Sequence, residues 1–163
     1  MEKVELNKTM HLSEHFTLGE VTKTSVKTAG NNIPSHVAIE NLKNLCENWL
    51  EELRENYNLI YEGVGDCKGD EPIIITSGYR SPEVNKAVGG APTSNHLTGC
   101  AVDIRCVGIE QAIRYACILL DISDGTKRDY DELFIERSKQ GRYWVHFAVR
   151  PKENRRKTAF IQT

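Results

Sequence analysis

The chain has 163 residues, of which 39% are hydrophobic and 27% are charged. These fractions are ordinary for a folded globular protein and exclude a disordered chain, a collagen or a coiled coil as a description of the whole. Lysine and arginine total 21 against 23 for aspartate and glutamate, a net charge of −2. This balance lacks the basic footprint that a nucleic-acid-binding protein needs for phosphate contacts.

The length fits a single domain over residues 1–163, because domains commonly run to ~100–200 residues. The longest apolar stretches are only a few residues, whereas a membrane-spanning helix needs ~20. The start of the chain has no apolar run of the ~7–15 residues that a secretory signal requires. We therefore expect no membrane span, a protein that is cytoplasmic as synthesised, and a monomer.

The first half of the chain predicts an irregular start, a long helix and a buried strand. Residues 1–35 are polar and rich in turn formers. From 36 to about 56, apolar residues recur every three or four positions, which predicts the longest amphipathic helix, capped by Ser35. Residues 72–77 are β-branched and continuous, as in a buried strand. The Ser-Pro pair at 81–82 then predicts a short helix that ends at the following Gly-Gly pair.

The second half predicts three strands and one helix. Residues 100–105 alternate as a strand, and residues 109–120 have the apolar spacing of a helix. Residues 132–136 and 143–149 read as a β-hairpin with a polar turn of about six residues. Residues 151–163 form a basic tail, expected to be a solvated extension. The predicted architecture is α+β, a small antiparallel sheet with helices packed on one side.

Strand alternation brings three potential metal ligands to one face of this sheet. Asp103 lies opposite the apolar residues of its strand, and His146 shares the polar face of the last strand with Trp144. His96 lies in the glycine-containing turn just before the strand of Asp103. Two imidazoles and a carboxylate are a ligand set of catalytic zinc, although iron also uses it. Taken singly, each histidine also fits a hydrogen-bonded structural role.

Three motifs carry a resemblance to a known family. They are ITSGYRSP at 75–82, SNHLTGCAVDI at 94–104 and WVH at 144–146, and LSEHFTL at 12–18 accompanies them. In this order and spacing they resemble the zinc D-Ala-D-Ala carboxypeptidase family. Its members are peptidoglycan peptidases that share a fold with D-Ala-D-Ala dipeptidases and the hedgehog signalling domain. The resemblance runs from about residue 12 to residue 150.

The resemblance implies a role for each matching residue. His96, Asp103 and His146 match the ligands of one zinc ion per chain. Arg80 matches an arginine that holds the substrate carbonyl and steadies the oxyanion, a role that suits a permanently charged guanidinium. Ser94 matches a serine beside the ligand turn that contacts the substrate or a ligand.

The general base is less directly implied. The dipeptidase branch carries a glutamate three residues before its last histidine ligand, where this chain has Tyr143. The other branches place the acid/base group at the end of the preceding strand, which is Glu136 here. The hairpin would fold Glu136 toward Trp144, which we expect to contact substrate. The gap between Glu136 and the last histidine is longer than the family's, and a different hairpin register would favour Asp131 or Glu132 instead.

The activity that the resemblance implies is zinc-dependent hydrolysis of a bond involving D-amino acids in the stem peptides of bacterial peptidoglycan. Without a secretory signal, a phage or prophage endolysin-like enzyme, or an exported cargo, is expected, acting on the cell wall after release or export. One alternative is a catalytically inactive, zinc-containing module that binds peptidoglycan or a protein. Another is a metal-free structural domain of a phage or mobile-element particle.

Overall fold

The structure is a computed structural model that describes residues 6–28 and 30–163. In these residues one long helix interrupted by a π-helical turn is followed by strands and shorter helices. In chain order the elements are α1 (His36–Leu45), η1 (Cys46–Leu50), α2 (Glu51–Tyr61), β1 (Ile75–Ser77), α3 (Pro82–Ala87), the 3₁₀ turn η2 (Asn95–Thr98), β2 (Ala101–Cys106), α4 (Gly108–Thr126), β3 (Glu132–Arg137), β4 (Tyr143–Ala148) and β5 (Lys157–Gln162).

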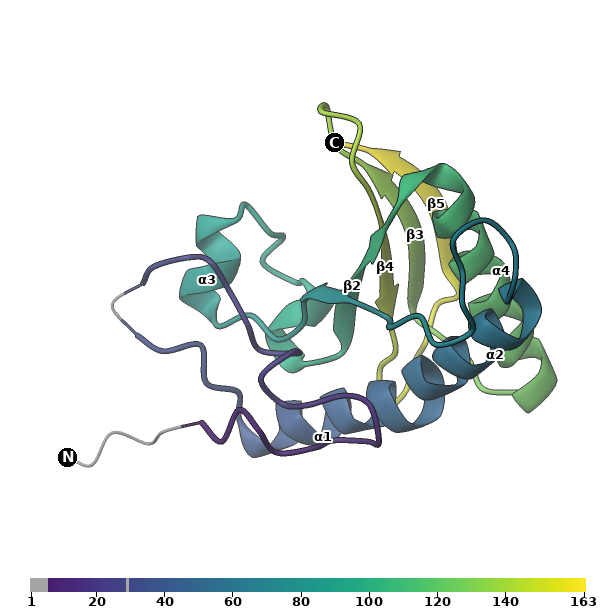
Figure 1. The fold of residues 1–163 in the computed structure, drawn as a ribbon. Coiled ribbons are helices and arrows are strands. Elements are labelled where there is room, and N and C mark those ends of the chain that lie inside the picture. The colour runs from purple at the N-terminus through teal and green to yellow at the C-terminus, as the bar shows by residue number, and fades with distance from the viewer. Residues whose placement is uncertain (1–5, 29) are drawn as a thin grey trace.

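The strands form one sheet in the order β1-β2-β4-β3-β5. The pairs β1–β2, β2–β4 and β3–β4 are antiparallel, and β5 joins β3 in parallel. The long helix and α4 lie on one side of the sheet, while α3 and the turn before β2 lie beyond its other face (Figure 1). The fold is therefore α+β, as predicted, with its two longest helical segments on one side and the short α3 on the other. The sheet is mixed, not purely antiparallel, because β5 is parallel to β3.

Residues 151–163 are mostly exposed to solvent, as predicted, but the expectation that they form a free extension is wrong. Lys157–Gln162 forms strand β5 along the whole of β3. The basic residues just before it are held by acids, since Arg155 binds Asp131 at 2.8 Å and Arg156 binds Asp129 at 3.1 Å. The positive charges that suggested a solvated tail are ion-pair partners that guide the chain onto the sheet edge.

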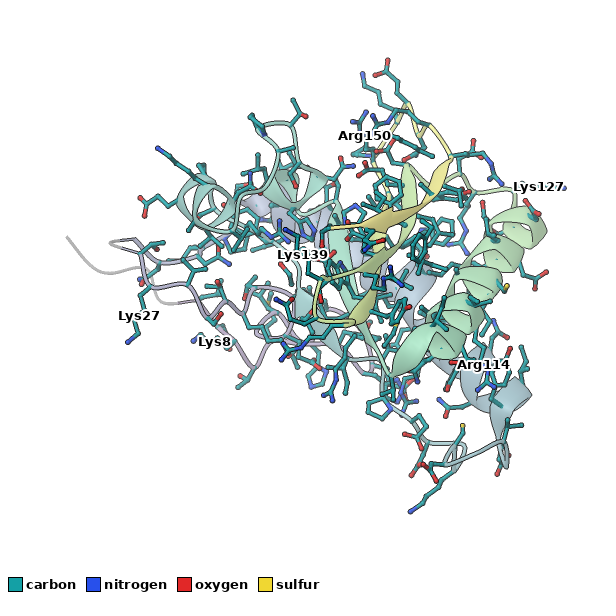
Figure 2. The ribbon with its side chains drawn as sticks, turned by 90° about the horizontal axis from the view of Figure 1, so that it is seen from above. Lys8, Lys27, Arg114, Lys127, Lys139 and Arg150 are labelled. Carbon is teal, nitrogen blue, oxygen red and sulfur yellow. The ribbon has the colours of Figure 1, made fainter. Side chains whose placement is uncertain are left out.

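The three predicted helices are confirmed, the short one as α3 and the other two with longer bounds. The first continues past residue 56 to Tyr61, and the hydroxyl of Ser35 caps it by accepting the backbone N–H of Ala38 at 3.1 Å. Helix α4 continues past residue 120 to Thr126, and Lys127, labelled in Figure 2, directly follows its last turn. Among the described residues, no helix has the length and apolar character needed to cross a membrane.

The core lies between the helices and one face of the sheet. Trp49 of η1 packs against Phe147 of β4 with ring centroids 5.1 Å apart. Burial of such side chains supplies the main driving force, ~1.5–3 kcal/mol each. The apolar strand residues that share this face are Val102, Ile104, Leu133, Val145 and Phe147. Because side chains alternate along a strand, the opposite face receives the polar residues of the candidate site.

Candidate metal centre

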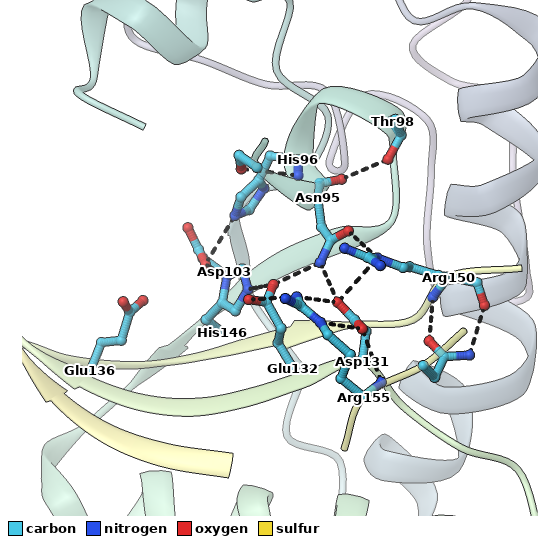
Figure 3. Close-up of polar contacts among 12 residues, drawn as sticks. Asn95, His96, Thr98, Asp103, Asp131, Glu132, Glu136, His146, Arg150 and Arg155 are labelled. Carbon is cyan, nitrogen blue, oxygen red and sulfur yellow. Dashed lines mark hydrogen bonds and ion pairs between the residues drawn. The ribbon is translucent and has the colours of Figure 1, made fainter. Parts of the chain in front are cut away.

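The structure brings His96, Asp103 and His146 together, as the sequence predicted. One ligand atom from each lies within 4.8 Å of the others. Asp103 Oδ1 lies 3.3 Å from His96 Nε2 and 3.1 Å from His146 Nδ1 (Figure 3). Asp103 and His146 are directly opposite each other in the β2–β4 register, and His96 approaches from η2. All three side chains are buried.

This donor set fits zinc. Zinc bonds of ~2.0–2.1 Å in tetrahedral geometry separate neighbouring ligand atoms by about 3.3–3.4 Å. The two distances from Asp103 Oδ1, 3.3 and 3.1 Å, are close to that spacing. Three protein ligands also match the catalytic zinc pattern, in which a fourth position stays open for water or substrate.

Local backbone contacts fix the ring of His96. Its Nδ1 atom lies 2.6 Å from the carbonyl oxygen of Gly78, which leaves Nε2 facing Asp103. The hydroxyl of Ser94 caps η2 by accepting the backbone N–H of His96 at 3.2 Å. Ser94 therefore positions a ligand, and its contact with substrate stays a prediction.

The ring of His146 is held between two carboxylates. Its Nδ1 faces Asp103, and its Nε2 lies 3.1 Å from Glu132 Oε1. Phe134 stacks on the ring with centroids 5.3 Å apart and planes 16° apart. Burial opposes the charged ring, but the two carboxylates outweigh it and raise the pKa of His146 to about 9. Likewise burial alone would raise the pKa of Asp103, and the two histidines hold it below its ordinary value.

Arg80 lies at the site and contacts Asp103, one of the three candidate metal ligands. Its Nη2 donates to Asp103 Oδ2 at 3.0 Å and its Nε donates to the hydroxyl of Ser77 at 3.0 Å. Its backbone N–H also donates to the carbonyl of His96 at 3.0 Å. A guanidinium has five N–H donors, so the others remain for a substrate oxygen.

Asp131 is one of three acids on or beside β3, and all of its contacts are hydrogen bonds and ion pairs within the fold. Its side chain is 0% exposed. Arg155 donates to both of its oxygens, at 3.0 and 2.8 Å, and Asn95 donates to Oδ2 at 2.8 Å. Burial alone would raise the pKa of Asp131, but these donors lower it to about 2.

The other two acids, Glu132 and Glu136, have opposite environments. Glu132 accepts from Asn95 at 2.7 Å and faces His146, and these contacts overcome burial and lower its pKa. Glu136 accepts the indole N–H of Trp144. Burial, assisted by the charge of Asp103, raises the pKa of Glu136. Its carboxylate is on the same side of the sheet as Asp103 and His146 (Figure 3).

A cleft of about 510 Å³ joins these residues. The predicted site residues that line it are Arg80, Ser94, His96, Asp103, Glu136, Trp144 and His146. Trp144 is partly exposed in it, which is compatible with the predicted contact to substrate. Arg150 and Arg155, in the segment that leads into β5, and Lys157, the first residue of β5, border the same cleft.

Sequence reasoning missed three supporting residues. Asn95, next to a ligand, bridges Asp131 and Glu132, and its signal was only its place in the S-N-H run. Arg155 looked like part of a solvated tail. The sequence marks Gly78 only as a member of the ITSGYRSP motif. A Cβ on it would lie 2.2 Å from the carbonyl oxygen of Val21, so the close approach of two backbones requires glycine.

A comparison with known protein families gives one match. Residues 14–123, about two thirds of the chain, match the family described as Peptidase M15. The match includes Arg80, His96 and Asp103, whereas Glu136 and His146 follow it. No curated protein matches the chain. A match over more than half of the chain shows that it belongs to the Peptidase M15 family, the zinc-dependent metallopeptidases that include D-Ala-D-Ala carboxypeptidases.

Proposed function

We propose that this protein hydrolyses a peptide bond involving D-amino acids in the stem peptides of bacterial peptidoglycan. His96, Asp103 and His146 are the proposed ligands of one zinc ion per chain. The observation that carries the proposal is this buried three-ligand cluster in the wall of a cleft that also contains Glu136 and Arg80. A carboxylate beside such a metal site is the usual source of acid–base catalysis in metal-assisted hydrolysis.

Glu136 is the proposed general base because the other two acids are already engaged. Asp131 is fully buried and bound by Arg155. Glu132 faces the Nε2 atom of His146, so its carboxylate is placed to orient the ring of that proposed metal ligand. Glu136 has the indole of Trp144 as its hydrogen-bond donor and lines the cleft, where a water molecule can reach it.

When bound, zinc supplies Lewis-acid chemistry, polarising the scissile carbonyl and acidifying the attacking water. Glu136 takes a proton from that water and delivers it to the leaving nitrogen. Arg80 donates an N–H to the carbonyl oxygen as negative charge develops there. The C–N bond breaks, the hydroxyl stays on the carbonyl carbon, and the products are a carboxylate and an amine.

The proposed partners are peptidoglycan peptides, and no nucleic acid is expected from a net charge of −2. We propose that the protein acts on the cell wall after release or export, in the manner of a phage endolysin. The proposed state is a monomer.

The test is digestion of purified muropeptides by three zinc-loaded proteins, with products identified by mass spectrometry. These are the wild type, Glu136→Ala, and Glu40→Ala as a matched control that removes an exposed carboxylate from α1. We expect the wild type and the control to cleave one defined bond involving a D-amino acid, and Glu136→Ala to lose at least ~100-fold of the rate.

Two outcomes would overturn this proposal. If zinc binds at one ion per chain and no muropeptide is cleaved, the protein is a zinc-containing binding module. If Glu136→Ala cleaves as fast as Glu40→Ala, the general base is another residue.

A further inference from the structure

A second cavity adjoins the metal site on the side away from β5. It has a volume of about 970 Å³ and lies between the turn 138–142 and residues 106–108, at the end of β2 and the start of α4. We call it the hairpin cavity. Asp103 and Trp144 line both this cavity and the 510 Å³ cleft that holds His96 and His146. The metal site therefore opens on two sides.

The sheet register places the hairpin cavity one step from the metal ligands. Arg105 lies opposite Trp144, two residues along each strand from the pair formed by Asp103 and His146, and on the same face. Residues two apart on a strand are about 6.6 Å apart on the same face, and an extended peptide advances ~3.3–3.6 Å per residue. A substrate running along the strands would thus enter the hairpin cavity about two residues beyond the scissile bond.

Both spaces are large enough for more than one substrate residue. Their volumes, about 510 and 970 Å³, lie within the ~300–1,000 Å³ range of pockets that take drug-sized ligands. An enzyme that removes one terminal residue needs a wall that stops the chain just beyond the scissile bond. For a substrate that runs toward the turn 138–142, the hairpin cavity takes the place of such a wall.

The hairpin cavity also has positive charge available for a ligand. Arg105 and Arg142 line it, and in the part of the chain that the structure describes no carboxylate lies within ion-pair distance of either guanidinium. In contrast, Arg80 and Arg155 in the neighbouring cleft are paired with Asp103 and Asp131. Guanidinium groups bind carboxylates through charge-assisted, often bidentate hydrogen bonds.

We propose that the hairpin cavity is a second substrate-binding region that takes a peptide segment bearing a carboxylate, and that the enzyme is consequently an endopeptidase. Arg105 and Arg142 are the residues that bind the carboxylate. The substrate then has at least two residues on each side of the bond that is cleaved. This inference rests on the proposed peptidase function and adds the length and charge of its substrate.

The first test compares two substrates of the zinc-loaded wild type by mass spectrometry of the products. One is a monomeric stem pentapeptide with a free D-Ala-D-Ala end, and the other is a dimer of cross-linked stem tetrapeptides. We expect cleavage at a bond with two or more residues on each side. Release of a single terminal D-Ala and nothing else would overturn the inference and leave the proposed function standing. Absence of zinc-dependent cleavage would overturn the proposed function.

The second test measures binding without turnover. Zinc-loaded Glu136→Gln is titrated at low salt, by calorimetry, with an amidated stem peptide that contains D-glutamate and with its D-glutamine counterpart. We expect the acidic peptide to bind about tenfold more tightly, as a charged hydrogen bond allows. Adding Arg142→Ala or Arg105→Ala should remove most of that difference.

The matched control for the binding test is Lys139→Ala in the same background. Lys139 is exposed in the same turn, but it is not one of the described residues that line the hairpin cavity. It should keep the preference for the acidic peptide, although it loses the same charge as Arg142→Ala. Equal affinity for the two peptides, or an equal loss with Lys139→Ala, would overturn the assignment of the cavity.

Discussion

The Nε2 atom of His146 lies 3.1 Å from Oε1 of Glu132, on the side of the ring away from Asp103. A carboxylate in that position fixes the orientation of a metal-binding imidazole and increases its basicity. Glu132 is itself held by the side-chain amide of Asn95 at 2.7 Å. Asn95, the neighbour of the ligand His96, thus holds Glu132, the hydrogen-bond partner of the ligand His146. The two histidine ligands are therefore connected through one network.

Removal of Glu132 should weaken zinc binding more than it disturbs the fold. We expect Glu132→Ala to lose ~10–100-fold in zinc affinity, the usual effect of deleting a partner of a ligating histidine. The measurement is competition with a chromogenic chelator. Glu136→Ala is the matched control, because it removes the same charge from the same face of β3. Equal zinc affinity in the two variants would contradict the orienting role of Glu132.

Trp144 should influence the acidity of Glu136. Its indole donates a hydrogen bond to that carboxylate, which favours the ionised form and opposes the upward effect of burial on the pKa. Trp144→Phe removes the donor and keeps an aromatic ring, so the pKa of Glu136 should rise. The acidic limb of the kcat/KM profile should therefore move to higher pH, with zinc affinity unchanged. An unmoved acidic limb would argue against Glu136 as the base.

The sequence predicts the part of the site that depends on local periodicity. Alternation alone puts Asp103 and His146 on the face away from Val145 and Phe147, and antiparallel pairing then brings them opposite each other. The same logic separates Glu136 from the core. Alternation gives only the face on which each side chain lies. The pairing of Asp103 with His146 joins strands 43 residues apart, and the sequence predicts it only through the family resemblance.

Contacts that depend on register or on distant segments were beyond such patterns. The contact of Glu132 with His146 needs the exact alignment of β3 with β4, which left three acids open as the base. Strand β5 was missed because its basic neighbours resemble a solvated tail, and only the position of Asp131, 24 residues earlier, explains Arg155. No local signal marks a charge whose partner lies on another strand.

Asp131 should make stability depend on pH in the acid range. Its pKa is about 2 in the folded protein against ~3.9 when unfolded, so its ionised form stabilises the fold above pH ~4. That contribution, roughly 2.5 kcal/mol, is lost progressively as the pH falls from about 4 through 2. We expect Asp131→Asn to lower the free energy of unfolding in urea by about this amount at pH 7, and by progressively less below pH 4.

The control for Asp131 is the nearby Asp129, a largely exposed partner of Arg156. Exposed ion pairs contribute ~0–1 kcal/mol, so Asp129→Asn should change the free energy of unfolding little at any pH. A loss in Asp131→Asn that stayed constant from pH 7 down to pH 2.5 would show that its effect is not electrostatic.

Gly78 should be intolerant of even one methyl group. A Cβ there would lie 2.2 Å from the carbonyl oxygen of Val21, and the carbonyl of Gly78 is the group that holds Nδ1 of His96 at 2.6 Å. Gly78→Ala must therefore shift backbone at the metal site. We expect it to destabilise the fold by ~1–3 kcal/mol and to weaken zinc binding, measured by urea unfolding and chelator competition.

The control is Gly125→Ala in α4, where nothing lies within 4 Å of the added Cβ. This change should instead stabilise the fold by ~0.5–1 kcal/mol through helix propensity. If Gly78→Ala were as stable as the wild type and bound zinc equally well, the approach of the Val21 and Gly78 backbones would not be what positions His96.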